Sequence, residues 1–185
     1  MTETSSMVVV MSKSDSRYPI GDFQRPSELS DRERDEMISE IAALPVRLQE
    51  ALAGLDEDMV QTPYREGGWT LLQVAHHLAD SHINSLCRFK LALTEERPVI
   101  RPYLEDEWVS LADARDSADA AVKLLVGVHR KWVAILQSMS SEDFSRTLVH
   151  PDTGVWTLDQ MLALYAWHGR HHLAHITEAR RIRGW

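Results

Sequence analysis

The sequence contains a single cysteine, Cys87, among its 185 residues. One thiol cannot form an internal disulfide or build the CxxC pairs that hold zinc or exchange disulfides. The chain therefore carries no sign of an oxidising compartment, and a metal site in it would need nitrogen and oxygen ligands. We expect Cys87 itself to be a buried apolar filler.

Basic charge and long apolar runs are also scarce. The net charge is -8, whereas binding to phosphate-rich partners requires clustered Lys and Arg, so we predict no nucleic-acid or membrane partner. The run MVVVM at residues 7–11 is far shorter than the roughly 20 residues of a membrane helix, and no signal-peptide pattern accompanies it. We expect a cytoplasmic protein with a disordered extension over residues 1–17 and one domain over residues 18–185.

Four stretches have the apolar spacing of amphipathic helices. Three of them begin with a capping box, in which Ser or Thr is followed three residues later by Glu or Gln. These boxes start at Ser30, Thr70 and Thr157. The remaining helix is expected over residues 112–139, and Pro45 should kink the first one.

Alternating strand patterns are scarce, so the sequence predicts an all-α four-helix bundle. Residues 97–108 should form a long irregular connection between the second and third helices. The second and fourth helices open on a shared W-T-L-x-Q motif, at residues 69–73 and 156–160. We therefore expect the second and fourth helices to begin with similar local structure.

Histidines are concentrated in the second and fourth of these helices. Seven of the nine lie in two short windows: His76, His77 and His82, then His168, His171, His172 and His175. Imidazole is the commonest metal ligand, and helices of a bundle can bring distant ligands together. The sequence therefore predicts a metal ion.

The last helix supplies the clearest ligand pair. His168 and His172 continue an apolar stripe at three- and four-residue steps, so both should point inward. Residues four apart on a helix are about 6 Å apart, close enough to share one ion. His171 and His175 form a second such pair one face over, and we expect them to orient the ligands by hydrogen bonds or to face solvent.

Periodicity does not select a third ligand on the second helix. Both His76 and His77 lie off the apolar centre of that helix. His77 shares its face with a polar strip that includes Ser81 and Arg88, which makes it the better candidate to line a solvent-filled opening of the bundle. The alternative is that these histidines form a solvated helix face. His129 is expected on a helix surface, and His150 in a loop.

Long runs of the chain resemble a known family. They are YPIGDF, TPYREGGWT, HHLADSHINSLCRFKLALTEERPVIRPY, HPDTG and LYAWHGRHHLAHITEARRIRGW, between residues 18 and 185. With these runs the chain resembles the DinB/YfiT superfamily, and more closely its YfiT (BstA) branch, described as metal-dependent hydrolases and bacillithiol S-transferases. The resemblance implies a helical bundle that carries one metal ion and forms a homodimer.

The resemblance also implies a ligand set. In the family the first ligand follows a Trp by eight residues, and here that residue is His77 after Trp69. The later pair is an H-x-x-x-H whose first His follows an aromatic residue, which corresponds to His168 and His172. Zinc is the default expectation for the ion, and nickel, manganese and iron also accept imidazole.

Three imidazoles would leave coordination positions open, which is typical of catalytic sites. We therefore expect a metal-dependent hydrolase that activates water for attack on a small-molecule substrate, with Asp80 or His175 accepting the proton. One alternative is an S-transferase that conjugates a low-molecular-weight, bacillithiol-like thiol to electrophiles, with Arg88 or Arg170 holding the carboxylates of the thiol. A second alternative is a non-catalytic metal-binding bundle.

Overall fold

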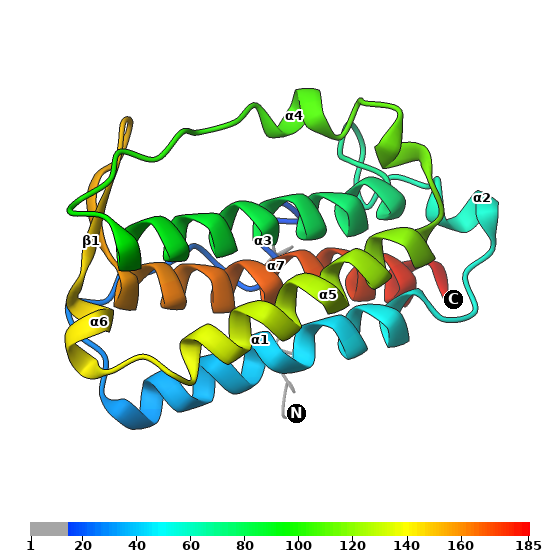
Figure 1. The fold of residues 1–185 in the computed structure, drawn as a ribbon. Coiled ribbons are helices and arrows are strands. Elements are labelled where there is room, and N and C mark those ends of the chain that lie inside the picture. The colour runs from blue at the N-terminus through cyan, green and yellow to red at the C-terminus, as the bar shows by residue number, and fades with distance from the viewer. Residues whose placement is uncertain (1–14) are drawn as a thin grey trace, which may run out of the picture.

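Four long helices lie side by side in the structure, a computed structural model that describes residues 15–185 (Figure 1). They are α1 (Asp31–Leu52), α3 (Leu71–Thr94), α5 (Ala118–Leu136) and α7 (Leu158–Arg183). Helix α1 packs against α5 and α7, and α3 packs against the same two helices. The prediction of an all-α four-helix bundle is confirmed.

Short elements join the long helices. They are α2 (Glu57–Val60), α4 (Glu105–Trp108), the 3-10 helix η1 (Asp113–Arg115), α6 (Ser141–Ser145), and the strands β1 (Thr147–His150) and β2 (Gly154–Thr157). The strands pair antiparallel, with Thr147 opposite Thr157. The sequence did not indicate this hairpin, because four-residue strands are too short to show alternation. His150, expected in a loop, is the last residue of β1.

All three predicted capping boxes are present. The side chains of Ser30, Thr70 and Thr157 each accept a hydrogen bond from the backbone N–H three residues later, and the Glu or Gln there accepts one from the cap backbone. The Thr and Gln of the shared W-T-L-x-Q motif are thus the two halves of a cap. Helix α7 ends at Arg183 and is capped by Gly184, whose φ of 72° favours glycine.

We predict that Thr70→Ala and Thr157→Ala each lower the free energy of unfolding by about 1 kcal/mol, because each leaves helix N–H groups without an acceptor. Urea denaturation measures the loss. The matched control is Thr177→Ala, since Thr177 is exposed within α7 and its hydroxyl only donates to the Ala174 carbonyl. Equal losses in all three variants would contradict the capping role.

Helix α1 passes through Pro45, the residue at which we expected a kink, without a break in the helix assignment. Proline has no N–H, so the carbonyl of Ile41 loses its usual partner four residues on. That carbonyl accepts a hydrogen bond from Nδ1 of His129 on α5 instead, at 2.6 Å. A tertiary contact thus replaces the missing helical bond.

The third long helix is shorter than expected. It covers residues 118–136 instead of 112–139, because Ser117 caps it by accepting from the N–H of Ala120. The 3-10 helix η1 occupies most of the preceding residues. The helix ends earlier as well, since Ser140 opens the separate helix α6.

Residues 95–117 form the connection between α3 and α5, and this connection is more ordered than the irregular segment expected over residues 97–108. It contains α4 and η1 and passes along the side of the bundle formed by α3 (Figure 1). Several hydrogen bonds tie it to the rest of the chain, among them Ile100 N–H to the Val149 carbonyl (2.9 Å), Gln73 Nε2 to the Val109 carbonyl (3.0 Å) and Trp69 Nε1 to Asp106 Oδ1 (2.9 Å). The connection is therefore held over α3 at several points.

The core consists of two apolar clusters. One contains Phe89 and Trp132, and the other contains Leu48 and Leu78. Between them along α3 and α7 the buried side chains are mostly polar: His77, Ser81, His82, Ser85, His171, His172 and His175. A layer of histidines therefore crosses the middle of the bundle.

Two expectations on burial are wrong. Cys87 is exposed, because it lies on the outward side of α3 beyond the buried Leu86. His129 is buried, with 2% of its surface exposed, because its ring faces α1 and finds a hydrogen-bond partner there. Helical spacing alone does not reveal such a partner on another helix.

The expected disordered extension, residues 1–17, lies outside the described residues except for 15–17. There the N–H of Tyr18 donates to the carbonyl of Asp15 and forms a turn. The apolar run at residues 7–11 also lies outside. Within residues 15–185, none of the helices has the length and hydropathy that a bilayer crossing requires.

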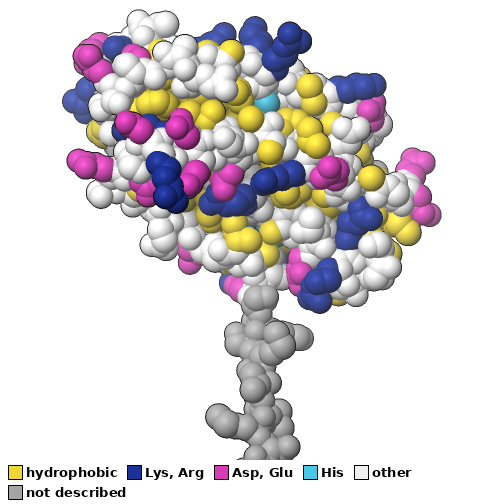
Figure 2. Space-filling view, turned by 90° about the horizontal axis from the view of Figure 1, so that it is seen from below, with side chains coloured by type: hydrophobic (Ala, Val, Ile, Leu, Met, Phe, Trp, Pro, Cys, Tyr) yellow, Lys and Arg dark blue, Asp and Glu magenta, His cyan; other side chains and the backbone are white. Residues whose placement is uncertain are grey.

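The face of the molecule drawn in Figure 2 carries charged side chains of both signs. Lys and Arg alternate there with Asp and Glu, and apolar side chains lie between them. This face shows no continuous basic patch of the kind that binds a phosphate backbone. The lack of a basic patch on this face agrees with the net charge of -8.

Candidate metal centre

Three imidazoles converge between α3 and α7. His77, His168 and His172 each offer a ring nitrogen, and these nitrogens all lie within 4.8 Å of one another. The Nε2 atoms of His77 and His168 are 3.2 Å apart. Two nitrogens bound at 2.0–2.1 Å to a tetrahedral zinc ion would be about 3.3 Å apart. The donor set therefore fits a divalent cation.

The helices explain how these rings meet. His168 and His172 are one turn apart on α7, and α7 packs against α3, which carries His77. On its other side α7 lies close to α1 at Gly169, where an added Cβ would be 2.7 Å from Cδ2 of Leu44. Glycine beside His168 thus lets α7 fit between α1 and α3.

Burial keeps these rings neutral. It lowers the pKa of His77 to about 4, and it lowers the pKa values of His168 and His172 well below their usual range, with neighbouring imidazoles adding to the effect. Neutral imidazole is the form that binds metals. The Nδ1 atoms of His77 and His172 are buried without a hydrogen-bond partner among the described residues.

An aromatic wall covers the cluster on one side. The ring of Trp69 lies 4.6 Å from the ring of His77 and 6.2 Å from that of His172, measured between centroids. Trp69 belongs to the W-T-L-x-Q motif and directly precedes the cap of α3. The same short motif therefore starts the helix and shields the imidazole that follows two turns later.

A second group of histidines adjoins the first on α7. His171, His172 and His175 also have ring nitrogens within 4.8 Å of one another, and all three are buried. His175 donates from Nε2 to the carbonyl of Arg17 at 3.2 Å and stacks on Tyr64, with centroids 4.0 Å apart. His171 and His175 therefore do not face solvent, and His172 belongs to both groups.

The His77 cluster opens into a cavity of about 500 Å³. Side chains from α3, the connection, the hairpin and α7 line it: Trp69, His77, Ser81, Arg88, Pro102, Tyr103, Glu105, His150, Asp152, Trp167, His168, His171 and His172. Tyr103, Glu105, His150 and Asp152 were not expected in the site. A signal was available, because the runs ending in RPY and beginning with HPDTG carry three of them.

The two arginines expected to bind a thiol are in different places. Arg88 lines the cavity and donates from Nη1 to the hydroxyl of Tyr165 at 2.9 Å. Arg170 lies on the side of α7 that faces α1 and forms an ion pair with Glu40. The structure brings Arg88 to the candidate site and does not bring Arg170 there.

The two residues expected to accept a proton do not line the cavity. Asp80 is half-buried on α3, where burial and the nearby charge of Asp113 raise the pKa of its carboxyl. His175 is buried behind His172, and burial lowers its pKa to about 4. The carboxylates that do line the cavity are Glu105 and Asp152.

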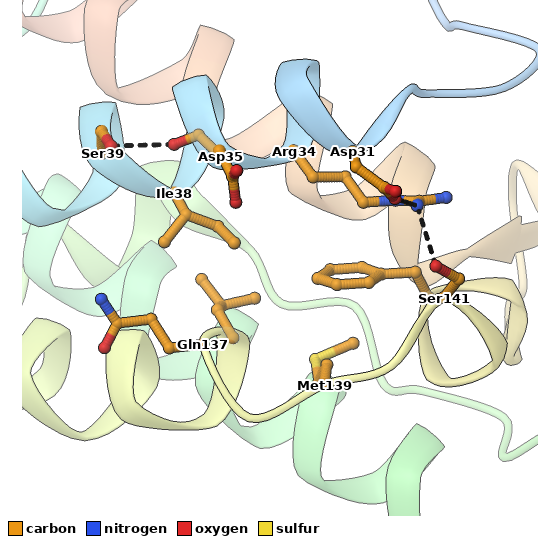
Figure 3. A pocket seen from close by; sticks show the side chains of 10 residues that line it. Asp31, Arg34, Asp35, Ile38, Ser39, Gln137, Met139 and Ser141 are labelled. Atoms are coloured by element: carbon orange, nitrogen blue, oxygen red, sulfur yellow. Dashed lines mark hydrogen bonds and ion pairs between the residues drawn. The ribbon is translucent and has the colours of Figure 1, made fainter.

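A second hollow of about 390 Å³ lies between α1 and the segment after α5 (Figure 3). Its cation, Arg34, already donates to Asp31, Ser141 and the buried carboxylate of Asp159, with Nε and Oδ1 of the last pair 2.7 Å apart. The hollow contains no histidine. Its charges stabilise the junction of α1, α6 and α7, and the hollow offers little to a ligand.

Comparisons with known proteins agree with this architecture. The model of the DinB superfamily matches residues 40–176. A relative from Bacillus cereus (strain AH820) named "Putative metal-dependent hydrolase" is 47% identical over 171 residues, which are 92% of this chain and 99% of the relative.

Two solved structures extend the comparison. YfiT from Bacillus subtilis, described as "a probable metal-dependent hydrolase with an unusual four-helix bundle topology", is 44% identical with a TM-score of 0.90, over 92% of this chain and 98% of that one. The four-helix bundle protein TT2238, at 20% identity and a TM-score of 0.53, covers 82% of this chain and 99% of that one and shows the fold alone. The chain studied here belongs to the DinB superfamily.

Proposed function

We propose that this protein is a metal-dependent hydrolase in which His77, His168 and His172 hold one divalent ion. The observation that carries the proposal is the convergence of three neutral imidazoles in the lining of a cavity. A three-ligand site keeps a coordination position for water or substrate, as catalytic zinc sites do. The names of the relatives point to the same class of reaction.

Zinc is the metal we favour, and nickel, manganese and iron are the alternatives. When bound, such an ion supplies Lewis-acid chemistry, lowering the pKa of water toward about 7 and polarising a carbonyl group. The protein must then accept a proton and keep bulk water out. Glu105 and Asp152 are the carboxylates that share the cavity, so we assign proton acceptance to one of them in place of Asp80 or His175. Trp69 and Trp167 supply apolar walls.

Arg88 suggests the nature of the substrate. It is the only Lys or Arg among the described residues that line the cavity, and its bond to the Tyr165 hydroxyl holds the guanidinium in place. We propose a small-molecule substrate with an anionic group. The same residue favours a second candidate, an S-transferase that binds the carboxylate of a low-molecular-weight, bacillithiol-like thiol, without a contribution from Arg170.

We predict that the zinc-loaded protein hydrolyses members of an ester panel, faster when they carry a carboxylate, and that His168→Ala abolishes the reaction. Either Glu105→Gln or Asp152→Asn should lower kcat about 10²–10⁴-fold, the usual contribution of general acid–base catalysis. Glu107→Gln is the matched control, because Glu107 lies on α4 two residues away and does not line the cavity.

The same protein should also be incubated with a thiol and an electrophile. Turnover in that assay alone would establish the transferase and refute the hydrolase. Turnover in neither assay, with metal bound, would establish a non-catalytic metal-binding bundle. We further propose a cytoplasmic protein, in line with its composition, and a homodimer, as the family resemblance implies. Light scattering coupled to size exclusion would reveal a monomer if the homodimer is wrong.

A further inference from the structure

Two histidines outside the candidate ligand set connect His168 to the backbone of α1. His82 on α3 is fully buried and His129 on α5 is 2% exposed. Nδ1 of His168 lies 3.3 Å from Nε2 of His82, Nδ1 of His82 lies 2.8 Å from Nε2 of His129, and Nδ1 of His129 lies 2.6 Å from the carbonyl oxygen of Ile41. Three rings thus form an unbroken row of hydrogen bonds.

The carbonyl at the end of the row fixes where the first proton sits. A backbone carbonyl can only accept, so Nδ1 of His129 must carry a hydrogen. Burial lowers the pKa of His129 to about 4, so near pH 7 the ring is neutral and has only this one N–H. Its Nε2 must therefore accept the hydrogen bond from Nδ1–H of His82.

His82 and His168 are constrained in the same way as His129. His82 is fully buried among the rings of Trp132, Tyr165 and its two histidine neighbours, and none of its ring contacts among the described residues is a carboxylate. A second hydrogen on this ring would place an unpaired charge in the core, so the ring carries one. With its one hydrogen on Nδ1, its Nε2 accepts from Nδ1–H of His168. The remaining nitrogen of His168, Nε2, then carries a lone pair and is the atom 3.2 Å from Nε2 of His77.

The row begins at Ile41 because of Pro45. In an α-helix the N–H of residue 45 would donate to the carbonyl of residue 41, and proline has no N–H to donate. The carbonyl is free to accept from His129 on the neighbouring helix. A proline inside α1 and a histidine on α5 therefore act together at this point.

We propose that Pro45, His129 and His82 are positioning residues that fix His168 as its Nδ1–H tautomer and present its Nε2 lone pair to the metal ion. The proposal rests on the metal site of the proposed function and adds three residues to it. Metal-binding histidines commonly donate their other N–H to a carbonyl or carboxylate, which fixes the tautomer. Here the acceptor is an imidazole, and the backbone carbonyl lies two rings further on.

The wild-type protein provides the first test, because tautomers are visible without any metal. Two-bond ¹H–¹⁵N NMR spectra of the metal-free, histidine-labelled chain near pH 7.5 should show the hydrogen on Nδ1 of His82, His129 and His168. A hydrogen on Nε2 of His168 or of His129 would overturn the proposal, and no variant has to fold for this result.

Variants test the effect of these residues on the affinity for zinc. The affinity for Zn²⁺ is measured in competition with a chromophoric chelator. His82→Phe should weaken zinc binding about 10–100-fold, the usual cost of losing an orienting partner, and should abolish the single tautomer of His168. His129→Leu should act in the same direction. His129→Gln should restore binding, because an amide both donates and accepts. Unchanged zinc affinity in a folded His82→Phe protein would refute the positioning role.

The control for removing a buried imidazole from α3 is His76→Leu. His76 is also buried, but its Nε2 bonds to the carbonyl of Asp116, 3.1 Å away, and its ring is not part of the row. Zinc affinity should stay at the wild-type value. A loss equal to that of His82→Phe would overturn the proposal. A wild-type chain that shows the expected tautomers but binds no zinc would instead refute the proposed metal site.

Discussion

Zinc content is expected to fall from one ion per chain to no measurable ion when His172 is replaced by alanine. The three rings come from two helices, so the loss of one leaves two imidazoles and open space on the cavity side. The affinity should drop by more than the roughly 10–100-fold that the loss of an orienting partner costs. Elemental analysis after dialysis, on protein purified without a polyhistidine tag, measures the change.

The two histidine groups on α7 can be separated in the same experiment. His77→Ala and His168→Ala should also lose the ion, whereas His171→Ala should retain most of it. The opposite pattern would place the ion in the group formed by His171, His172 and His175. His150→Ala is the matched control, because His150 lines the cavity outside both groups. Equal zinc in the wild type and His172→Ala would contradict the ligand assignment.

Acid should unfold the metal-free protein between pH 6.5 and pH 4. The pKa of His129 is about 4 in the folded chain and 6.5 in the unfolded chain, so the unfolded state takes up the proton first. Stability is therefore full above pH 6.5 and is lost as the pH falls toward 4, by up to about 3 kcal/mol for one such group at 1.36 kcal/mol per unit. His77 and His175 shift in the same direction. A loss of this size is a large part of the stability of a typical domain, about 5–15 kcal/mol.

Urea denaturation of the metal-free protein at pH 7.5, 6 and 5 tests this expectation. The free energy of unfolding should decrease at each step. His129→Gln should show a smaller decrease, because it removes one buried base while keeping a group that can bond to the Ile41 carbonyl. A free energy that stays constant from pH 7.5 to 5 would show that the buried histidines are not kept neutral by the fold.

The helices and the inward direction of one candidate ligand pair could be predicted because they depend on local sequence. Capping boxes mark where α1, α3 and α7 begin, and the apolar stripe of α7 includes His168 and His172. Helix α3 did not yield to the same approach, because it is buried on several sides and has no single apolar face. His76, His77 and His82 are all buried there and contact different partners, so the polar strip only favoured His77 and the family resemblance was needed to select it.

Long-range contacts determine the features that the sequence did not reveal. His129 has the spacing of a surface residue, and its partner is a carbonyl on another helix that Pro45 leaves free. From the sequence, Pro45 indicated only a kink in its own helix. The known effect of proline on a helix does not predict that a side chain on another helix will donate to the carbonyl that proline leaves free. Glu105 and His150 reach the cavity from short elements placed by hydrogen bonds across the chain.

The connection between α3 and α5 joins two kinds of residues. Ile100 and Val109 are buried and attach it to the bundle, whereas Tyr103 and Glu105, which lie between them, line the cavity and belong to neither apolar cluster. Evolution could therefore exchange the middle of this stretch and alter which compounds are accepted, while the buried anchors and the imidazoles below stay the same. Proteins with the same four helices could in this way differ in substrate selectivity through changes confined to the connection between α3 and α5.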